Sequence, residues 1–147
     1  MVRPVRADDR PWMRSSLAVG LAANSYFHGV ERALVYGLAA SVAKGSYFHG
    51  VERAHGDWDA LVVCTNDEDH EPAGWVVYRH TPTTTIAYAH VDEAFRGLGA
   101  WRALRTRLGL RDGQLVNVVL ASPQAMSTAR KRYLAKHNWG QVLEWLA

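Results

Sequence analysis

A strand that leads through a glycine-bearing loop into a helix constrains the fold of this chain more than any other feature. Residues 86–91 combine β-branched and aromatic side chains as strands do, and the apolar stripe within 99–108 predicts a helix. Gly97 and Gly99 lie between them. The first N–H groups of a helix have no intrahelical acceptors and lie at the positive end of the helix dipole, and glycines let the backbone come close to a ligand. The loop therefore suits a phosphate or pyrophosphate, although a tight turn into a helix explains two glycines equally well.

The rest of the chain predicts a mixed α/β fold in the order β-α-α-β-β-β-α-β-α-β. Apolar runs rich in β-branched residues predict strands, whereas apolar residues at helical spacing next to Asp, Pro or Gly predict helices. The further strands are expected over 2–6, 61–65, 74–78, 114–120 and 139–146. The further helices are expected from Asp8 or Asp9 to about Ala23, over 31–44, and from Pro123 onward, the last with Ala129, Tyr133 and His137 on one face.

The composition is typical of one domain over residues 1–147. The chain has 147 residues, of which 48% are apolar, and this suffices for one packed core. Its single cysteine, Cys64, cannot form an intramolecular disulfide, and no apolar run reaches the length of about 18 residues that a membrane span needs. We therefore expect a cytoplasmic protein without membrane contact. The net charge of +3 predicts no specific binding to nucleic acid, although basic residues cluster in 102–111 and 130–136.

Residues 13–54 contain a tandem duplication of about 21 residues. The letters of 25–33, Ser-Tyr-Phe-His-Gly-Val-Glu-Arg-Ala, recur unchanged at 46–54. Two copies are too few for a solenoid, so we interpret the duplication as a lengthened surface region. His28 and His49 form a pair only through this copying, and the sequence predicts no metal site.

The segment 91–101 resembles a motif of the GNAT superfamily of N-acetyltransferases. In that motif a strand ends in Val and is followed by Arg-Gly-x-Gly at the start of a helix; this chain reads Val-Asp-Glu-Ala-Phe-Arg-Gly-Leu-Gly-Ala-Trp. The hairpin over 62–75 and the pattern Ala129-x-x-x-Tyr133 are similar to further parts of the family, and 9–16 is similar to small GNAT-like proteins of bacteriophages. The resemblance covers nearly the whole chain. It implies a mixed, mostly antiparallel central sheet flanked by helices.

The resemblance also implies acetyl-coenzyme A as the acyl donor and an amine, of a small molecule or of a protein, as the acceptor. In the family, backbone N–H groups of the glycine loop hold the pyrophosphate, and the main chain at the strand end, here Val91, pairs with the pantetheine arm. The corresponding loop residues are Arg96, Gly97, Leu98, Gly99, Ala100 and Trp101.

Direct attack of an amine on a thioester needs a base for the amine and an acid for the leaving thiolate. Tyr133 matches the family's late tyrosine and is the predicted acid, because a phenol is protonated at neutral pH. His90, on the strand before the loop, is the predicted base. Both residue types also occur as packed core side chains. Asp92, Glu93 or a water relay are the alternative bases.

Two positions depart from the family's motif. Trp101 stands where the family has Gly or Ala, and an indole there fills the space that the pyrophosphate needs unless it turns into the core. Glu93 replaces the family's proline and brings a negative charge toward the anion site. The alternative prediction is a catalytically degenerate fold that acts as a phage virion or host-interaction protein, located in the virion or the host cytoplasm.

Overall fold

The structure is a computed structural model of the chain, and it describes residues 1–23, 58–65, 71–80, 82–120 and 123–137. The strands are β1 (Val2–Pro4), β2 (Asp59–Cys64), β3 (Pro72–Arg79), β4 (Thr85–Val91), β5 (Leu115–Val118) and β6 (Leu134–His137). The helices are α1 (Arg10–Ala23), α4 (Ala100–Leu108) and α5 (Pro123–Arg130), and short 3-10 turns cover Ala7–Asp9 and Glu93–Phe95. The predicted helix over 31–44, both copies of the repeat, and the predicted strand over 139–146 lie outside the described residues.

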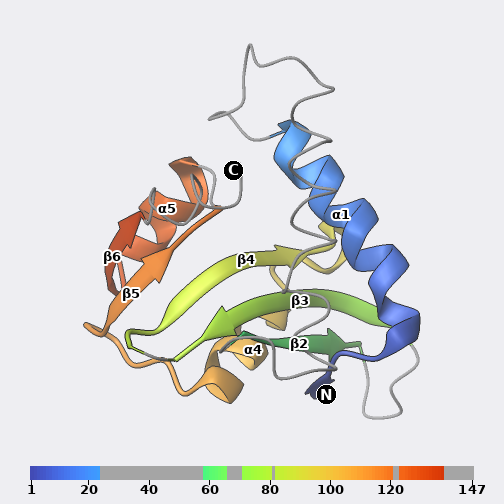
Figure 1. Cartoon of the computed structure of the whole chain (residues 1–147), viewed down its shortest axis with the longest axis horizontal. Helices are drawn as coiled ribbons and strands as arrows, with labels where there is room; N and C mark the ends of the chain where they lie inside the picture. The colour runs from blue at the N-terminus through green and yellow to red at the C-terminus, as the bar shows by residue number, and fades with distance from the viewer. Residues whose placement is uncertain (24–57, 66–70, 81, 121–122, 138–147) are drawn as a thin grey trace.

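The described strands form a six-stranded sheet whose order is that of the sequence. β1 to β4 pair antiparallel, and β5 and β6 continue the sheet parallel to β4. Figure 1 shows α1 at one side of this sheet, while β5, β6 and α5 turn away from β4 at the other. The predicted fold class is confirmed: the fold is mixed α/β, with a mostly antiparallel sheet flanked by helices.

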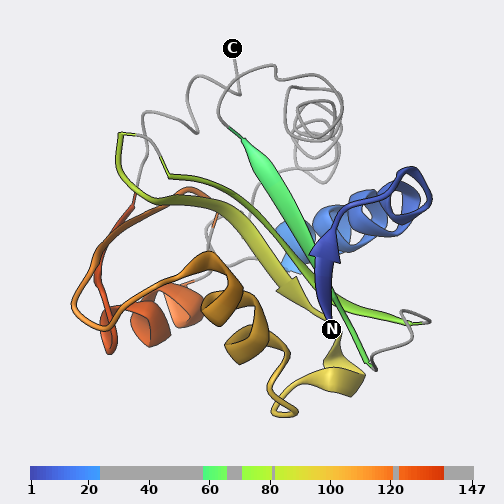
Figure 2. The same cartoon turned by 90° about the horizontal axis from the view of Figure 1, so that it is seen from below.

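The sheet separates two buried clusters. Side chains alternate between the two faces of a strand, so neighbouring residues of β2 and β3 enter different clusters. Val62 and Val77 belong to the cluster on the α1 side, whereas Val63 and Val76 belong to the cluster that includes side chains of α4 and lies beside α5. Figure 2 shows α1 on one side of the sheet and α4 and α5 on the other. We call these the α1 face and the α4 face.

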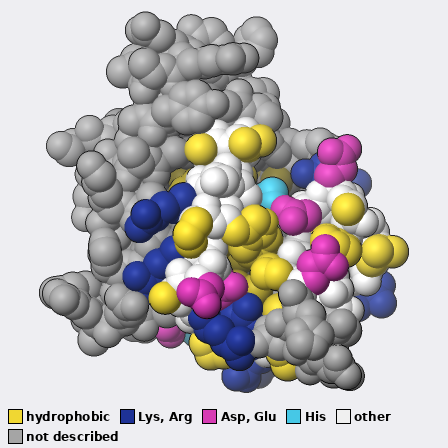
Figure 3. All heavy atoms as spheres, turned by 90° about the vertical axis from the view of Figure 1, so that its right-hand side faces the viewer, with side chains coloured by type: hydrophobic (Ala, Val, Ile, Leu, Met, Phe, Trp, Pro, Cys, Tyr) yellow, Lys and Arg dark blue, Asp and Glu magenta, His cyan; other side chains and the backbone are white. Residues whose placement is uncertain are grey.

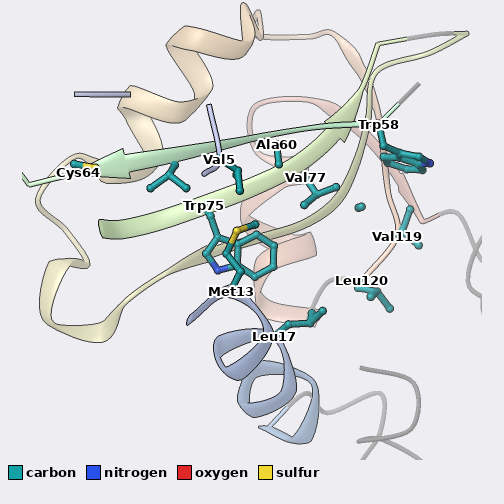
Figure 4. Packing of buried hydrophobic residues seen from close by; sticks show 12 residues of the cluster. Val5, Met13, Leu17, Trp58, Ala60, Cys64, Trp75, Val77, Val119 and Leu120 are labelled. Atoms are coloured by element: carbon teal, nitrogen blue, oxygen red, sulfur yellow. The ribbon is translucent and has the colours of Figure 1, made fainter. Parts of the chain in front are cut away.

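Trp75 is at the centre of the core on the α1 face. Its side chain is buried, and its indole N–H donates to the hydroxyl of Ser16 on α1 at 2.8 Å. Met13 and Leu17 lie four residues apart on α1 and pack into the same cluster (Figure 4). This spacing puts both side chains on one side of the helix, so α1 docks along a single apolar stripe.

The last predicted helix is shorter than the sequence indicates. α5 begins at Pro123, as predicted, but ends at Arg130. The amides of Lys131 and Arg132 donate to carbonyls three residues earlier, which ends the helix in a 3-10-type turn. Residues 134–137 then pair with β5. Tyr133 and His137 therefore do not lie on this helix, contrary to the prediction. The free edge of β5 offers backbone partners along a whole strand, and this tertiary pairing overrides the local helical spacing.

The start of α1 also differs from the prediction that the helix begins at Asp8 or Asp9. A 3-10 turn over Ala7–Asp9 precedes α1, and the Asp9 carboxylate accepts a hydrogen bond from the backbone N–H of Arg6 at 2.7 Å. Asp9 thus caps this turn by reaching back along the chain. Within the part of the chain that the structure describes, no helix is long and apolar enough to cross a membrane.

Candidate active site

β4 leaves β5 part of the way along its length. Among the described residues, the last backbone bond between these neighbours is donated by Leu120, just after β5, to the carbonyl of Ala87 at 2.9 Å. On the other side, β4 pairs with β3 and has a β-bulge at Ala87. Ile86 and Tyr88 pair with two consecutive residues of β3, so Ala87 has no partner residue on that strand. Such a bulge bends a strand and increases its twist. The bulge therefore coincides with the point where the two parallel strands separate (Figure 1).

Beyond the bulge, the described residues provide no strand partner for the edge of β4 that faces away from β3. The N–H of Asp92 donates to the carbonyl of Ala73 on β3 at 2.9 Å. Because bonding directions alternate along an antiparallel pair, the backbone groups of Ala89 and Val91 point away from β3. The carbonyl of Val91 accepts a hydrogen bond from the Arg96 side chain at 3.2 Å. The backbone groups of Ala89 and the N–H of Val91 therefore form an edge to which an extended ligand can pair.

The glycine loop and the start of α4 follow this edge directly. Gly97 and Gly99 have φ angles of 78° and 91°, in the left-handed region that favours glycine. A Cβ added to either would meet nothing within 4 Å, so the space beside both residues is open. The first bond of the helix is donated by Ala103 to Gly99, which leaves the amides of 100–102 without intrahelical acceptors. The loop thus presents backbone donors at the positive end of a nine-residue helix.

Trp101 is turned toward the core. It is partly buried and packs against the cluster on the α4 face. Leu104, three residues further along the same side of the helix, is fully buried in that cluster. Leu98, by contrast, has 75% of its surface exposed, and Glu93 is also exposed. Of the two orientations that the sequence allows for the indole, the structure has the one that packs into the core.

His90 lies on the α1 face of β4 beside two tryptophans. Its ring centroid is 6.3 Å from that of Trp12 and 6.2 Å from that of Trp75. Its Nε2 atom lies 2.6 Å from Oδ1 of Asp92. The His90 side chain has 16% of its surface exposed, so the ring is mostly buried but still reaches solvent. Figure 3 shows this side of the molecule, where histidine atoms reach the surface next to acidic and hydrophobic side chains.

Tyr88 lies on the same face of β4 as His90, and the sequence alone did not single it out. Its ring lies 5.2 Å from that of Trp75, on the same face as His90. Burial raises the pKa of the Tyr88 phenol, and the positive charge of Arg96 partly offsets this effect. A side chain at Gly20 of α1 would overlap the Tyr88 hydroxyl, so the glycine lets β4 and α1 come together here. The sequence could have indicated this, because Tyr88 and His90 are two residues apart on one strand and such residues share a face.

Tyr133, the predicted acid, lies on the opposite face of the sheet from His90. It stands in the bend between α5 and β6 and belongs to the cluster on the α4 face, with 5% of its surface exposed. Its hydroxyl is buried and makes no hydrogen bond of acceptable geometry. The Arg105 guanidinium is near enough that this hydroxyl raises the pKa of Arg105.

The structure thus brings most of the predicted site residues together and sets one apart. The predicted base, the strand end at Val91 and the loop over 96–101 are contiguous around the end of β4. Tyr133 lies in the cluster on the α4 face, against which Trp101 packs. Among the described residues, no group of three or more His, Cys, Asp or Glu side chains is arranged to hold a metal ion.

Three solved structures are similar to this one. A protein of Desulfovibrio desulfuricans assigned to the GNAT family is 17% identical, with a TM-score of 0.43, over 74% of this chain and 62% of that protein's length. A ribosomal-protein-alanine N-acetyltransferase from Brucella melitensis biovar Abortus is 13% identical, with a TM-score of 0.48, over 94% and 79% of the two chains. A transcriptional regulator from Bacillus halodurans is 16% identical, with a TM-score of 0.46, over 89% and 87%. The sequence matches no family model and no curated protein.

Proposed function

We propose that this chain transfers an acetyl group from acetyl-coenzyme A to a primary amine on a small molecule or a protein. One observation carries the proposal: among the described residues, the pairing of β4 with β5 ends at Ala87, and the unpaired part of β4 leads to the free amides at the start of α4. An acyl donor with a diphosphate at one end and a peptide-like arm in the middle needs both of these features side by side. The resemblance of 91–101 to the GNAT motif points to the same donor.

The residues present fit such a donor. A diphosphate needs several N–H groups and room beside them, and the open space at Gly97 and Gly99 meets the second need. The amides of 100–102 meet the first, at the positive end of the helix. The amide groups of a pantetheine arm can pair with Ala89 and Val91 as an added strand does.

The reaction needs two proton transfers, and residues on different faces of the sheet are proposed for them. When bound, acetyl-coenzyme A supplies an acetyl thioester whose carbonyl carbon is open to attack and whose sulfur leaves as a thiolate. His90, on the α1 face, takes a proton from the attacking amine through a ring nitrogen. Tyr133, on the α4 face, holds a phenol proton that can be given to the thiolate. The predicted base and the predicted acid thus lie on opposite faces of the sheet.

The experiment is calorimetric titration of the protein with acetyl-coenzyme A, using a pair of matched variants. Gly99 and Gly109 lie at the two ends of α4, both have positive φ, and a Cβ at either meets nothing within 4 Å. Gly99→Trp and Gly109→Trp therefore carry similar backbone strain. We expect the first to abolish the binding heat and the second to leave it unchanged, because only Gly99 lies beside the free amides.

Two results would contradict the proposal. An unmodified protein that gives no heat with millimolar acetyl-coenzyme A would remove the donor site. Equal losses in the two variants would show that the effect arises from strain on α4 and not from the loop.

The alternative is a degenerate fold with a virion or host partner. Trp101 favoured that alternative because an indole can fill the pyrophosphate space, and in the structure Trp101 packs against the core cluster instead. Under the proposed function the protein acts where acetyl-coenzyme A is available, which is the cytoplasm, or the host cytoplasm for a phage-encoded chain.

A further inference from the structure

Asp92 has the position of a helix cap but does not act as one. It immediately precedes the 3-10 turn Glu93–Phe95, where an Asp side chain ordinarily accepts a bond from the first amides of the turn. Its carboxylate makes no such capping bond and instead lies 2.6 Å from Nε2 of His90. The backbone of Asp92 is anchored by its bond to Ala73, so the carboxylate is presented to His90 from a fixed point.

The contact determines which nitrogen of His90 can act as a base. An ionised carboxylate only accepts hydrogen bonds, so Nε2 must carry a proton to meet Asp92. A neutral imidazole then has its lone pair on Nδ1, for which the described residues provide no partner. Trp12 and Trp75 flank the ring on the α1 face and restrict its rotation. The ring is therefore held in both tautomer and orientation.

We infer that Asp92 is a positioning residue that holds the Nε2–H tautomer of His90, so that Nδ1 accepts the proton of an amine arriving on the α1 face. The inference rests on the proposed function. In this step the amine nitrogen forms a bond to the acetyl carbon and the carbon–sulfur bond breaks. The amine proton goes to Nδ1, and the resulting imidazolium is stabilised by the Asp92 carboxylate.

The test combines a spectroscopic readout with turnover. Nitrogen-15 NMR of the histidine rings, with His90 assigned from a His90→Gln variant, reports the tautomer in the absence of any ligand. Turnover is followed as coenzyme A thiol released from acetyl-coenzyme A with spermidine, tryptamine or a lysine-containing peptide. The variants are Asp92→Asn, Asp92→Glu and, as control, Asp112→Asn, which removes a more exposed carboxylate that is hydrogen-bonded to Arg105.

We expect Nε2–H in the unmodified protein and in Asp112→Asn. In Asp92→Asn the side-chain amide can donate to Nε2, which moves the proton to Nδ1, and turnover falls about 100-fold or more while acetyl-coenzyme A affinity is retained. Asp92→Glu restores part of both the tautomer and the turnover, because the carboxylate returns.

The outcomes separate this inference from the proposed function. An Nδ1–H tautomer in the unmodified protein, or full turnover in Asp92→Asn, overturns the role of Asp92. An Nε2–H tautomer that switches in Asp92→Asn, together with no thiol release from the unmodified protein with any of the three amines, supports the positioning contact and overturns the transferase.

Discussion

At the scale of single residues, a buried ion pair ties the first strand to the first helix. The guanidinium of Arg3 makes two hydrogen bonds to the carboxylate of Asp9, at 2.7 and 2.9 Å, and both side chains are buried. The carboxylate also accepts from the backbone of Arg6. Burial disfavours the charged form of Asp9, but the bonds from Arg3 and Arg6 outweigh it, and the pKa of Asp9 lies below its ordinary value of 3.8.

We predict that Asp9→Asn lowers the free energy of unfolding by about 3–5 kcal/mol at neutral pH, because it removes the buried negative charge that makes two hydrogen bonds to Arg3. Since the folded pKa is below the unfolded one, the contribution of Asp9 is complete above about pH 4 and is lost as the pH falls through the folded pKa. Urea unfolding at a series of pH values checks this.

The difference between the unmodified protein and Asp9→Asn should therefore shrink in acid. A difference that stays constant down to about pH 2 would show that Asp9 acts through its shape and not through its charge. Asp112→Asn, at an exposed pair, is the control and should change stability little at any pH.

The Tyr133 hydroxyl permits a test that separates catalysis from packing. It is buried beside the Arg105 guanidinium and makes no well-aligned hydrogen bond to the described residues, so Tyr133→Phe should change the unfolding temperature little. If this phenol protonates the thiolate, turnover should fall about 100-fold. Thermal unfolding and thiol release measure the two effects, with Tyr78→Phe as control. Unchanged turnover would remove Tyr133 from the mechanism.

At the scale of elements, the bulge at Ala87 determines where the sheet opens. A polar junction keeps β4 and β5 together before that point. The side-chain amide of Gln114 donates to the Thr84 hydroxyl at 3.1 Å, and its oxygen accepts from the backbone of Arg111 at 3.0 Å. The strands therefore separate on one side of Ala87 only.

We predict that Gln114→Ala lowers the free energy of unfolding by about 1–2 kcal/mol, because it leaves the buried Thr84 without this donor. The change lies at the paired end of the strands, so the affinity for acetyl-coenzyme A should stay within about twofold. Urea unfolding and calorimetry measure both. If Gln114→Ala lowered the free energy of acetyl-coenzyme A binding as much as the free energy of unfolding, the donor site would not lie at the end of β4 beyond Ala87.

The sequence predicts an element well where one signal dominates locally. β-branched runs located β2, β3 and β4, and the apolar stripe after the glycine loop located α4, each to within a few residues. α5 was overextended because its last predicted residues pair with β5, and such pairing leaves no trace in local spacing. In the site, the glycine loop was predictable from its pattern. The contact between Asp92 and His90 was not, because an Asp before a turn predicts a cap.

At the scale of the whole molecule, the sheet places different chemistry on its two faces. The α1 face carries the His90–Asp92 pair among Trp12, Trp75 and Tyr88, and the α4 face carries α4 and the buried Tyr133. The free edge of β4 lies between the two faces and leads directly to the glycine loop. A donor bound along that edge would meet an acceptor from one side and an acid from the other.

Amide NMR during titration with acetyl-coenzyme A tests this arrangement most directly. The account predicts that the largest changes fall on the amides of Ala89, Val91 and Gly97 and on those of 99–102, because these backbone groups would contact the donor. Changes concentrated on β6 and α5, or no changes at saturating concentrations, would contradict it.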